Sequence, residues 1–300
     1  IENSIDAGAN SITIELKDGG LQMISIQDNG SGIDANNIEK AVKRHATSKI
    51  KTATDLTEIS SMGFRGEALA AISSVSELTL ASRTQNSPKG RKLELKDAKL
   101  KSNEAWNGSP GTLVIVENLF ASMPARAKFM KRPASELAHC GEVIQALSFA
   151  HPQVGFSLIH NEKLKFKYEK TTPSQKSQTG FLSESVLRER TTQIWNEEVT
   201  AKLIYVKETS PYGAIEGLIS PPNMVRATGK NLICLVNGRF VKDKTIVSGK
   251  VISVENDLVT IDVGSKSEGR VPISEFHRPG QKPEINVGDL FEVFIENFDN

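Results

Sequence analysis

The sequence predicts an α+β protein whose C-terminal part is a small β-barrel. Through residues 1–246, helical and strand patterns occur in blocks, which is typical of helices packed on a largely antiparallel sheet. Residues 247–300 contain only short strand patterns with Gly and Asp between them, which favours a barrel. With 300 residues, 38% of them hydrophobic, the chain is long enough to bury the cores of two or three domains.

The first part of the chain begins in a helical pattern, because Ile1, Ile5 and Ala9 recur at helical spacing. Two alternating segments follow, and the D-G-G sequence at residues 18–20 between them predicts a hairpin. Further helices are expected at residues 36–44, 66–74 and 125–149. Strands are expected at residues 11–16, 21–27, 77–82, 91–95, 112–117, 154–160 and 163–168.

A polar stretch at residues 170–179 lacks aliphatic side chains and predicts a linker, with a domain boundary near residue 180. Beyond it we expect a helix at residues 187–195 and strands at residues 201–206, 214–219 and 232–236. Four short strands are expected in the barrel, at residues 249–254, 258–263, 270–273 and 290–295. The predicted domains are therefore residues 1–180, 181–246 and 247–300.

Charge is distributed unevenly along the chain, although the net charge is only +1. Residues 247–300 contain five basic and ten acidic side chains, a net charge of −5, so the remainder carries +6. A mildly basic front part suits contact with DNA, but solvated surface lysines explain the excess equally well. The acidic tail is a poor ligand for polyanions.

No stretch approaches the roughly 20 apolar residues of a membrane helix, and the N-terminal residues do not resemble a signal peptide. We therefore expect a cytoplasmic protein without a membrane partner. Cys140 and Cys234 are far apart and lack metal-ligand spacing, so neither a zinc site nor a disulfide framework is expected.

The strongest motif is D-N-G-S-G-I at residues 28–33, at the end of a predicted strand and before a predicted helix. Alone it could be a tight turn, because Gly and Asn tolerate positive φ. Three further elements accompany it. Asn3 and Asp6 share one face of the first helix, R-H-A-T-S-K occupies residues 44–49, and G-F-R-G-E-A-L occupies residues 63–69.

Taken in chain order, these four elements resemble those of the GHKL ATPases. The sequences R-H-A-T-S-K and G-F-R-G-E-A-L resemble the MutL-type mismatch-repair members of that family. The resemblance continues through N-L-F, P-A-R and K-F within residues 118–129, and through V-N-G-R at residues 236–239. It covers residues 1–246. It implies the family's α/β sandwich for residues 1–180, a truncated S5-like second domain, and binding of ATP and Mg²⁺.

The chemistry of each element suits that ligand. Asp28 at a strand end can accept a hydrogen bond from the adenine amino group, while Gly30 and Gly32 let the backbone approach the nucleotide. Residues 63–69 combine two glycines with a helix start, which exposes N–H groups to phosphate oxygens. The nucleotide-binding residues implied are Asn3, Asp6, Asp28, Gly30, Gly32, Ile33, Thr47, Ser48, Lys49, Gly63, Phe64, Arg65, Gly66, Glu67, Ala68, Leu69 and Thr112.

Within this set, Asn3 is the implied Mg²⁺ ligand, because its carbonyl oxygen is a hard ligand of the kind that Mg²⁺ prefers. Arg65 and Glu67 could instead form an ordinary surface ion pair, so no chemistry is assigned to them. In the family, a general-base glutamate lies four positions before the metal-binding asparagine, a position that precedes Ile1. Glu2 is rotated from Asn3 by about 100° around the helix.

The family also places a lysine of an H-P-A-K segment on the γ-phosphate, and no such segment follows Arg239. No catalytic residue is therefore assigned within the chain. The resemblance implies nucleotide binding and leaves turnover open, because the contacts to the base do not depend on these two groups.

The tail at residues 249–300 resembles the OB-fold repeat of ribosomal protein S-one, through V-P-I-S-E-F and V-G-D-L-F-E-V-F-I-E. Thr260 and Pro272 occupy positions where RNA-binding repeats carry a stacking aromatic residue and a histidine. Phe276 and His277 could be an alternative stacking pair, but a turn-capping role is favoured for them. With its negative charge, this repeat is more similar to one that docks on protein.

Three hypotheses remain. The first is an ATP-dependent mismatch-repair protein that dimerises on binding ATP and contacts DNA and a mismatch-recognition partner of the MutS type. The second is a module that binds RNA or the ribosome through the tail. The third is a non-native join of two gene fragments near Ile246.

Overall fold

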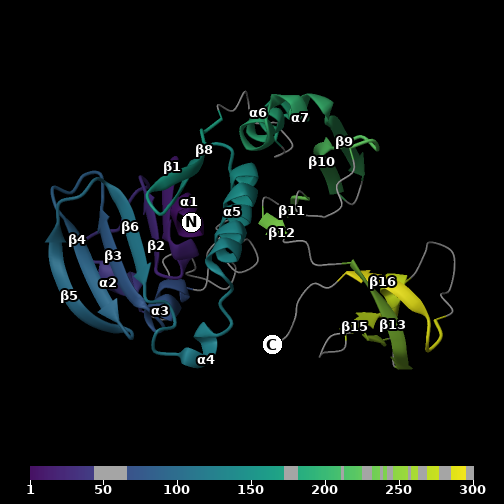
Figure 1. The fold of residues 1–300 in the computed structure, drawn as a ribbon, viewed down its shortest axis with the longest axis horizontal. Coiled ribbons are helices and arrows are strands. Elements are labelled where there is room, and N and C mark those ends of the chain that lie inside the picture. The colour runs from purple at the N-terminus through teal and green to yellow at the C-terminus, as the bar shows by residue number, and fades with distance from the viewer. Residues whose placement is uncertain are drawn as a thin grey trace. The chain divides into compact units, whose positions relative to one another are not determined.

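The chain folds into two compact units (Figure 1). The first comprises residues 1–227 and 237–239, and the second comprises residues 228–236 and 240–300. The computed structural model describes residues 1–43, 66–171, 182–210, 213–224, 232–236, 239–241, 246–255, 258–262, 269–276 and 285–294.

An eight-stranded sheet organises the first unit, in the order β5-β4-β3-β6-β2-β1-β7-β8. The pairing of β1 with β7 is parallel, and the other pairings in this sheet are antiparallel. The hairpin expected at the D-G-G sequence is confirmed as β1–β2, and the strands expected at residues 154–160 and 163–168 pair as a second hairpin, β7–β8. The strands are β1 (Ser11–Lys17), β2 (Met23–Asp28), β3 (Glu77–Arg83), β4 (Gly90–Lys96), β5 (Lys99–Trp106), β6 (Gly111–Glu117), β7 (Gly155–His160) and β8 (Lys163–Tyr168).

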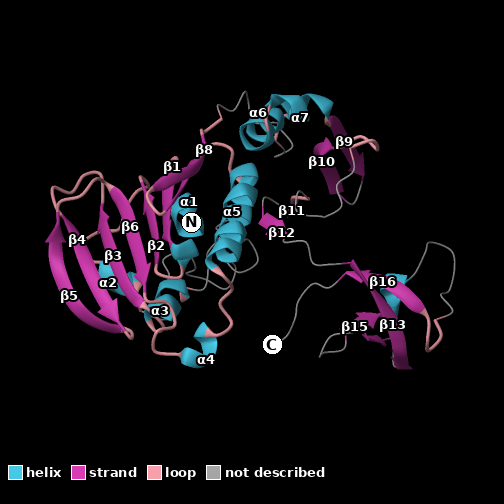
Figure 2. Cartoon of the chain, viewed as in Figure 1, coloured by secondary structure: helices cyan, strands magenta, loops and turns pink. Residues whose placement is uncertain are grey.

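Helices pack against this sheet and form two core clusters with it (Figure 2). In β1, Ile12, Ile14 and Leu16 are buried while the residues between them are less so, which is the alternation that predicted the strand. The first cluster joins β1 and β7 to α5, and the second joins β3 and β4 to α2 and α3. These helices are α1 (Glu2–Asp6), α2 (Ile38–Ala41), α3 (Ala68–Ser73) and α5 (Pro133–Ala150). The expected α+β class is confirmed.

The single helix expected at residues 125–149 is wrong, because two helices occupy this region. Helix α4 (Pro124–Ala127) ends before residue 128, and α5 starts at Pro133. Proline restricts the residue before it to an extended conformation, and Arg132 indeed has φ −62° and ψ 148°. The apolar spacing on either side of Pro133 therefore does not extend through it.

Strand β5 and the helix at residues 197–202 were not expected from the sequence. Strand β5 lies at the edge of the sheet and is mostly exposed, so its sequence shows no alternation of apolar and polar residues. Residues 201 and 202, which were expected to open a strand, belong to that helix, α7 (Glu197–Lys202), and β9 begins only at Ile204. Asn196 caps α7, because its Oδ1 accepts a hydrogen bond of 3.0 Å from Val199 N.

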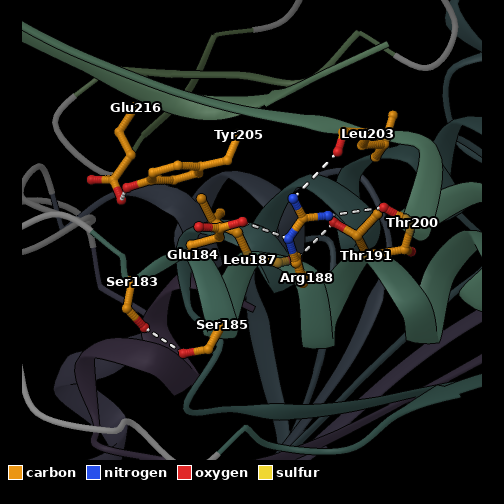
Figure 3. A network of polar contacts seen from close by, with 10 residues as sticks. All are labelled: Ser183, Glu184, Ser185, Leu187, Arg188, Thr191, Thr200, Leu203, Tyr205 and Glu216. Atoms are coloured by element: carbon orange, nitrogen blue, oxygen red, sulfur yellow. Dashed lines mark hydrogen bonds and ion pairs between the residues drawn. The ribbon is translucent and has the colours of Figure 1, made fainter. Parts of the chain in front are cut away.

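A helical region follows the large sheet and contains α6 (Glu184–Trp195), α7, β9 (Ile204–Ser210) and β10 (Gly213–Ile219). Arg188 links its elements (Figure 3). The guanidinium pairs with Glu184 at 2.7 Å and donates to the carbonyl oxygens of Thr200 at 3.0 Å and Leu203 at 3.3 Å. One side chain thus joins α6, α7 and the start of β9.

Arg190, two residues further along α6, connects this region to the large sheet. Its side chain is 0% exposed, and Nη2 donates to the carbonyl oxygens of Pro152 at 2.9 Å and Val154 at 3.0 Å. The guanidinium also lies 5.9 Å from the centre of the Tyr168 ring. Burial lowers the pKa of Arg190 to about 10, so the group is charged at neutral pH.

Tyr205 on β9 provides a pH-dependent contact in the same region. Its hydroxyl donates a 2.5 Å hydrogen bond to Oε1 of Glu216, and this bond raises the pKa of Tyr205 to about 12 from 10.0. Because the folded state holds the proton more tightly, the contact stabilises fully below pH 10 and is lost as the pH rises through about 12.

We therefore expect a tyrosinate absorbance titration to contain a step near pH 12 that belongs to Tyr205 and is removed by Tyr205→Phe. Glu216→Gln should instead move the step back towards pH 10, since the charged acceptor is gone. An unchanged titration in Glu216→Gln would contradict the assignment.

The second unit contains a four-stranded sheet in the order β15-β14-β13-β16, whose pairings are all antiparallel. Val251, Val259 and Ile261 form its core, and a register shift between Val251 and Ser253 bends β13. Such a curled sheet suits the small barrel expected from the sequence. The strands are β13 (Ile246–Glu255), β14 (Leu258–Asp262), β15 (Gly269–Pro272) and β16 (Leu290–Phe294), and β11 (Cys234–Val236) pairs separately with β12 (Arg239–Val241).

Among the helices in the described part of the chain, none combines the length and the apolar run needed to cross a membrane.

Candidate functional site

The candidate site is centred on Asp28, the last residue of β2. Its side chain is 8% exposed and lies opposite Thr112 of β6 in the sheet register. Asp28 Oδ1 accepts hydrogen bonds from Thr112 N at 3.1 Å and Gly30 N at 2.9 Å. Oδ2 accepts no hydrogen bond from another described residue. A fixed, nearly buried carboxylate therefore offers one oxygen to a hydrogen-bond donor.

Ser82 on β3 belongs to the same cluster, although it was not among the residues predicted from the sequence. It is 0% exposed, its Oγ accepts a 2.8 Å hydrogen bond from Ile33 N, and it lies 3.0 Å from Thr112 Oγ1. A signal for it was present, because Ser82 follows the buried Leu78 and Leu80 in the two-residue period of a strand. A hydroxyl on the inward face of a strand end is a candidate for a polar site.

The loop after Asp28 is held against two neighbours by its glycines. A Cβ on Gly30 would lie 2.9 Å from the Ala7 carbonyl oxygen, and one on Gly32 would lie 2.1 Å from the Arg83 carbonyl oxygen. Gly32 also has φ +71°, which L side chains rarely adopt. From the sequence, these glycines were expected to let the backbone approach a nucleotide. In the structure, the lack of a side chain at each of them also lets another segment of the protein pack closely against it.

The residues that follow α1, the helix of Asn3 and Asp6, are joined to this loop by hydrogen bonds. Ser31 N donates to the Ala7 carbonyl oxygen at 2.9 Å. Asn29 Oδ1 accepts from Asn10 N and from the next amide, both at 3.0 Å. Asn3 is exposed and Asp6 is half-buried.

His151, just after α5, is close enough to α1 for the acidic residues of that helix to influence its pKa. Burial lowers its pKa, while the carboxylates of Asp6 and Glu2 raise it to a smaller extent. The net effect of burial is to favour the neutral form of His151 at neutral pH.

The glycine-rich motif is described only in its second half. Gly66 has φ +63°, Glu67 precedes α3, and Ala68 at the start of the helix is exposed. Leu69 and Ile33 both pack against the second core cluster, so the structure connects this motif with the loop after Asp28. Six of the predicted residues lie outside the described part of the chain, namely Thr47, Ser48, Lys49, Gly63, Phe64 and Arg65.

Three family models match segments of the chain. Residues 1–122 match the family described as histidine kinase-, DNA gyrase B- and HSP90-like ATPase. Residues 191–253 match the DNA mismatch repair protein C-terminal domain, and residues 241–300 match the S1 RNA binding domain. The last two matches overlap at residues 241–253, where β13 begins.

Similar proteins and structures point the same way. The chain is 41% identical over 247 residues to the DNA mismatch repair protein MutL of Neisseria meningitidis, covering 82% of this chain and 35% of that protein. It thus spans about a third of the length of such relatives.

Two solved structures share the fold. The N-terminal domain of a DNA repair protein matches with a TM-score of 0.63 and 27% identity, covering 82% of this chain and 73% of that one. The MutL ATPase domain of Aquifex aeolicus complexed with ADP matches with a TM-score of 0.59 and 24% identity, covering 81% and 80%.

Proposed function

Since the chain belongs to the MutL family of DNA mismatch repair proteins through its N-terminal GHKL ATPase region, we propose that it binds ATP with Mg²⁺ at the site around Asp28. The observation that carries this proposal is the fixed carboxylate of Asp28. Its Oδ1 is occupied by two backbone N–H groups, so Oδ2 would accept a hydrogen bond from an external donor such as the adenine amino group.

The remaining predicted residues fit the other parts of the ligand. Asn3 is exposed on α1, and Ala7 at the end of this helix is hydrogen-bonded to the loop after Asp28; Asn3 would supply one oxygen to Mg²⁺. Mg²⁺ usually keeps several waters and phosphate oxygens as its other ligands, so one protein side chain is sufficient. Bound there, the metal would neutralise charge on the phosphates.

We propose that the phosphates lie towards α3, where the described Gly66, Glu67, Ala68 and Leu69 follow the rest of the glycine-rich motif. Lys49, Thr47 and Ser48 would add charge and hydroxyl contacts, and Gly63, Phe64 and Arg65 complete the set. Thr112 and Ile33 line the base side, and Asp6 supports α1. We assign no catalytic residue, so the proposal concerns binding rather than hydrolysis.

The wider role is proposed from the family. ATP binding would dimerise the chain and alter its contacts with DNA and with a mismatch-recognition partner of the MutS type. Three domains serve this role in the proposal: a GHKL domain at residues 1–180, an S5-like segment at residues 181–246 and an OB-fold at residues 247–300. A cytoplasmic location follows from the same role.

Equilibrium binding of a fluorescent non-hydrolysable ATP analogue with Mg²⁺ tests the proposed site. The parent chain should bind saturably, and Asp28→Asn should weaken binding by at least about tenfold, because an amide nitrogen replaces the oxygen that faces the base. Asn keeps an oxygen for the two N–H groups, so the variant is expected to stay folded. Asp28→Ala should abolish binding.

The matched control is Asp34→Asn, an exposed aspartate whose Oδ1 accepts a hydrogen bond from Asn36 N at 2.9 Å. It should bind the analogue like the parent chain. If the parent is folded by circular dichroism and yet does not bind, the proposed function is wrong.

A second candidate function is RNA or ribosome binding by the tail, which the match to the S1 RNA binding domain favours. Its charge of −5 and the absence of an aromatic residue at Thr260, which pairs with Arg270, weigh against it. A titration with labelled single-stranded RNA distinguishes the two functions. A join of gene fragments near Ile246 stays a hypothesis, which the genomic sequence across residues 241–253 tests.

A further inference from the structure

Two hydroxyl groups lie side by side next to Asp28, and their protons can be assigned. Ser82 of β3 and Thr112 of β6 are direct partners in the sheet register, with their oxygens 3.0 Å apart. Ser82 Oγ also accepts from Ile33 N at 2.8 Å and donates to the Gly111 carbonyl oxygen at 2.8 Å. Ser82 thus has three partners and is fully buried.

A serine hydroxyl has one proton to donate and two positions at which it can accept. The Gly111 carbonyl oxygen can only accept, so the proton of Ser82 goes to it. Ile33 N fills one accepting position. The contact between the two hydroxyls therefore uses the proton of Thr112, which fills the second position. Thr112 is left without a proton for any other partner, and towards a ligand its oxygen can only accept.

We propose that Ser82 determines the base specificity of the site by engaging the proton of Thr112. Asp28 and Thr112 are joined by the 3.1 Å bond from Thr112 N, so two acceptors lie together, and among the hydrogen bonds of the described residues neither side chain has a proton left to donate. A 6-amino purine can donate its amino protons to these acceptors. A 6-oxo purine would place a carbonyl oxygen against them, which costs binding free energy because no hydrogen bond replaces its water.

This inference rests on the proposed function, since it concerns the base of a nucleotide bound at Asp28. It also gives Ser82 a positioning role that its burial alone does not imply. A serine that only filled space would leave the ratio of affinities for two purine bases unchanged when replaced.

The experiment is competition of ADP and of IDP, its 6-oxo analogue, against the fluorescent ATP analogue with Mg²⁺ on the full chain. The parent should prefer ADP. Ser82→Ala frees the Thr112 proton to donate, so the preference for ADP should fall by about tenfold. In a Thr112→Val background, Ser82→Ala should not change the preference, because no hydroxyl proton remains to be released.

Ser148→Ala is the matched control, because Ser148 is also 0% exposed and donates to a backbone carbonyl, that of Gln145 at 2.7 Å. It should keep the parent preference. If Ser82→Ala does not fold, Ser82→Cys has nearly the same shape with a weaker donor and acceptor, and carries the same expectation.

The outcomes separate the two proposals. Absence of binding of both nucleotides by the folded parent overturns the proposed function. A parent that binds ADP, but shows either no preference over IDP or the same preference after Ser82→Ala, overturns the role of Ser82 alone.

Discussion

Replacing Arg190 with alanine is expected to lower the free energy of unfolding of the first unit by about 3 to 5 kcal/mol. The guanidinium is 0% exposed, so its removal leaves a cavity between α6 and the turn that precedes β7. It also withdraws the donor shared by the carbonyl oxygens of Pro152 and Val154. Both losses act at the same buried point.

Trp195, at the end of α6, gives a local probe of this effect, because its ring lies 5.9 Å from that of Phe149. Urea unfolding should be followed by its fluorescence in a Trp106→Phe background, which removes the chain's other tryptophan. A local probe is needed since a chain of two units need not unfold in one step. The midpoint should fall markedly in Arg190→Ala.

Arg188→Ala is the matched control, on the same helix and also hydrogen-bonded to two backbone carbonyls. Its side chain is 32% exposed, so water can replace the lost contacts, and the loss should be about 1 to 2 kcal/mol. Equal losses in the free energy of unfolding for the two substitutions would show that the burial of Arg190 does not determine its contribution to stability.

Gly32→Ala is expected to cost about 2 to 4 kcal/mol and to abolish binding of the ATP analogue. The added Cβ would lie 2.1 Å from the Arg83 carbonyl oxygen, a backbone atom that cannot move without shifting β3. Such a shift displaces Ser82 as well as the loop after Asp28. Stability and binding should therefore be lost together.

Gly8→Ala measures the cost of the left-handed backbone conformation without the cost of a steric clash. Gly8 has the same φ of +71°, but a Cβ there would meet no described atom within 4 Å. It should cost only about 1 kcal/mol, the penalty of the left-handed conformation. Urea unfolding and the binding titration should be carried out on both variants. Similar losses of stability and binding in the two would show that the contact with Arg83 has no role.

Local sequence was sufficient for most of the large sheet. The alternation of Ile12, Ile14 and Leu16 predicted β1, and the D-G-G turn predicted its pairing with β2, because neighbours along the chain decide both. Local patterns failed where a neighbour in space decides the conformation. Strand β5 exists because β4 offers it an edge, and Pro133 divides a helix whose apolar spacing looks continuous.

For the candidate site, the sequence by itself determined which residue types are available: Asp28 at a strand end, glycines after it, and Thr112 before an apolar run. It could not determine that Ser82 lies with these residues at the site, or that Arg190 is hydrogen-bonded to the turn that precedes β7. Ser82 meets Thr112 across 30 positions of sequence, and Arg190 meets Pro152 across 38. Sequence patterns record which face of a strand or helix is buried, whereas hydrogen-bond partners depend on strand register and on packing between distant segments, which only the tertiary structure decides.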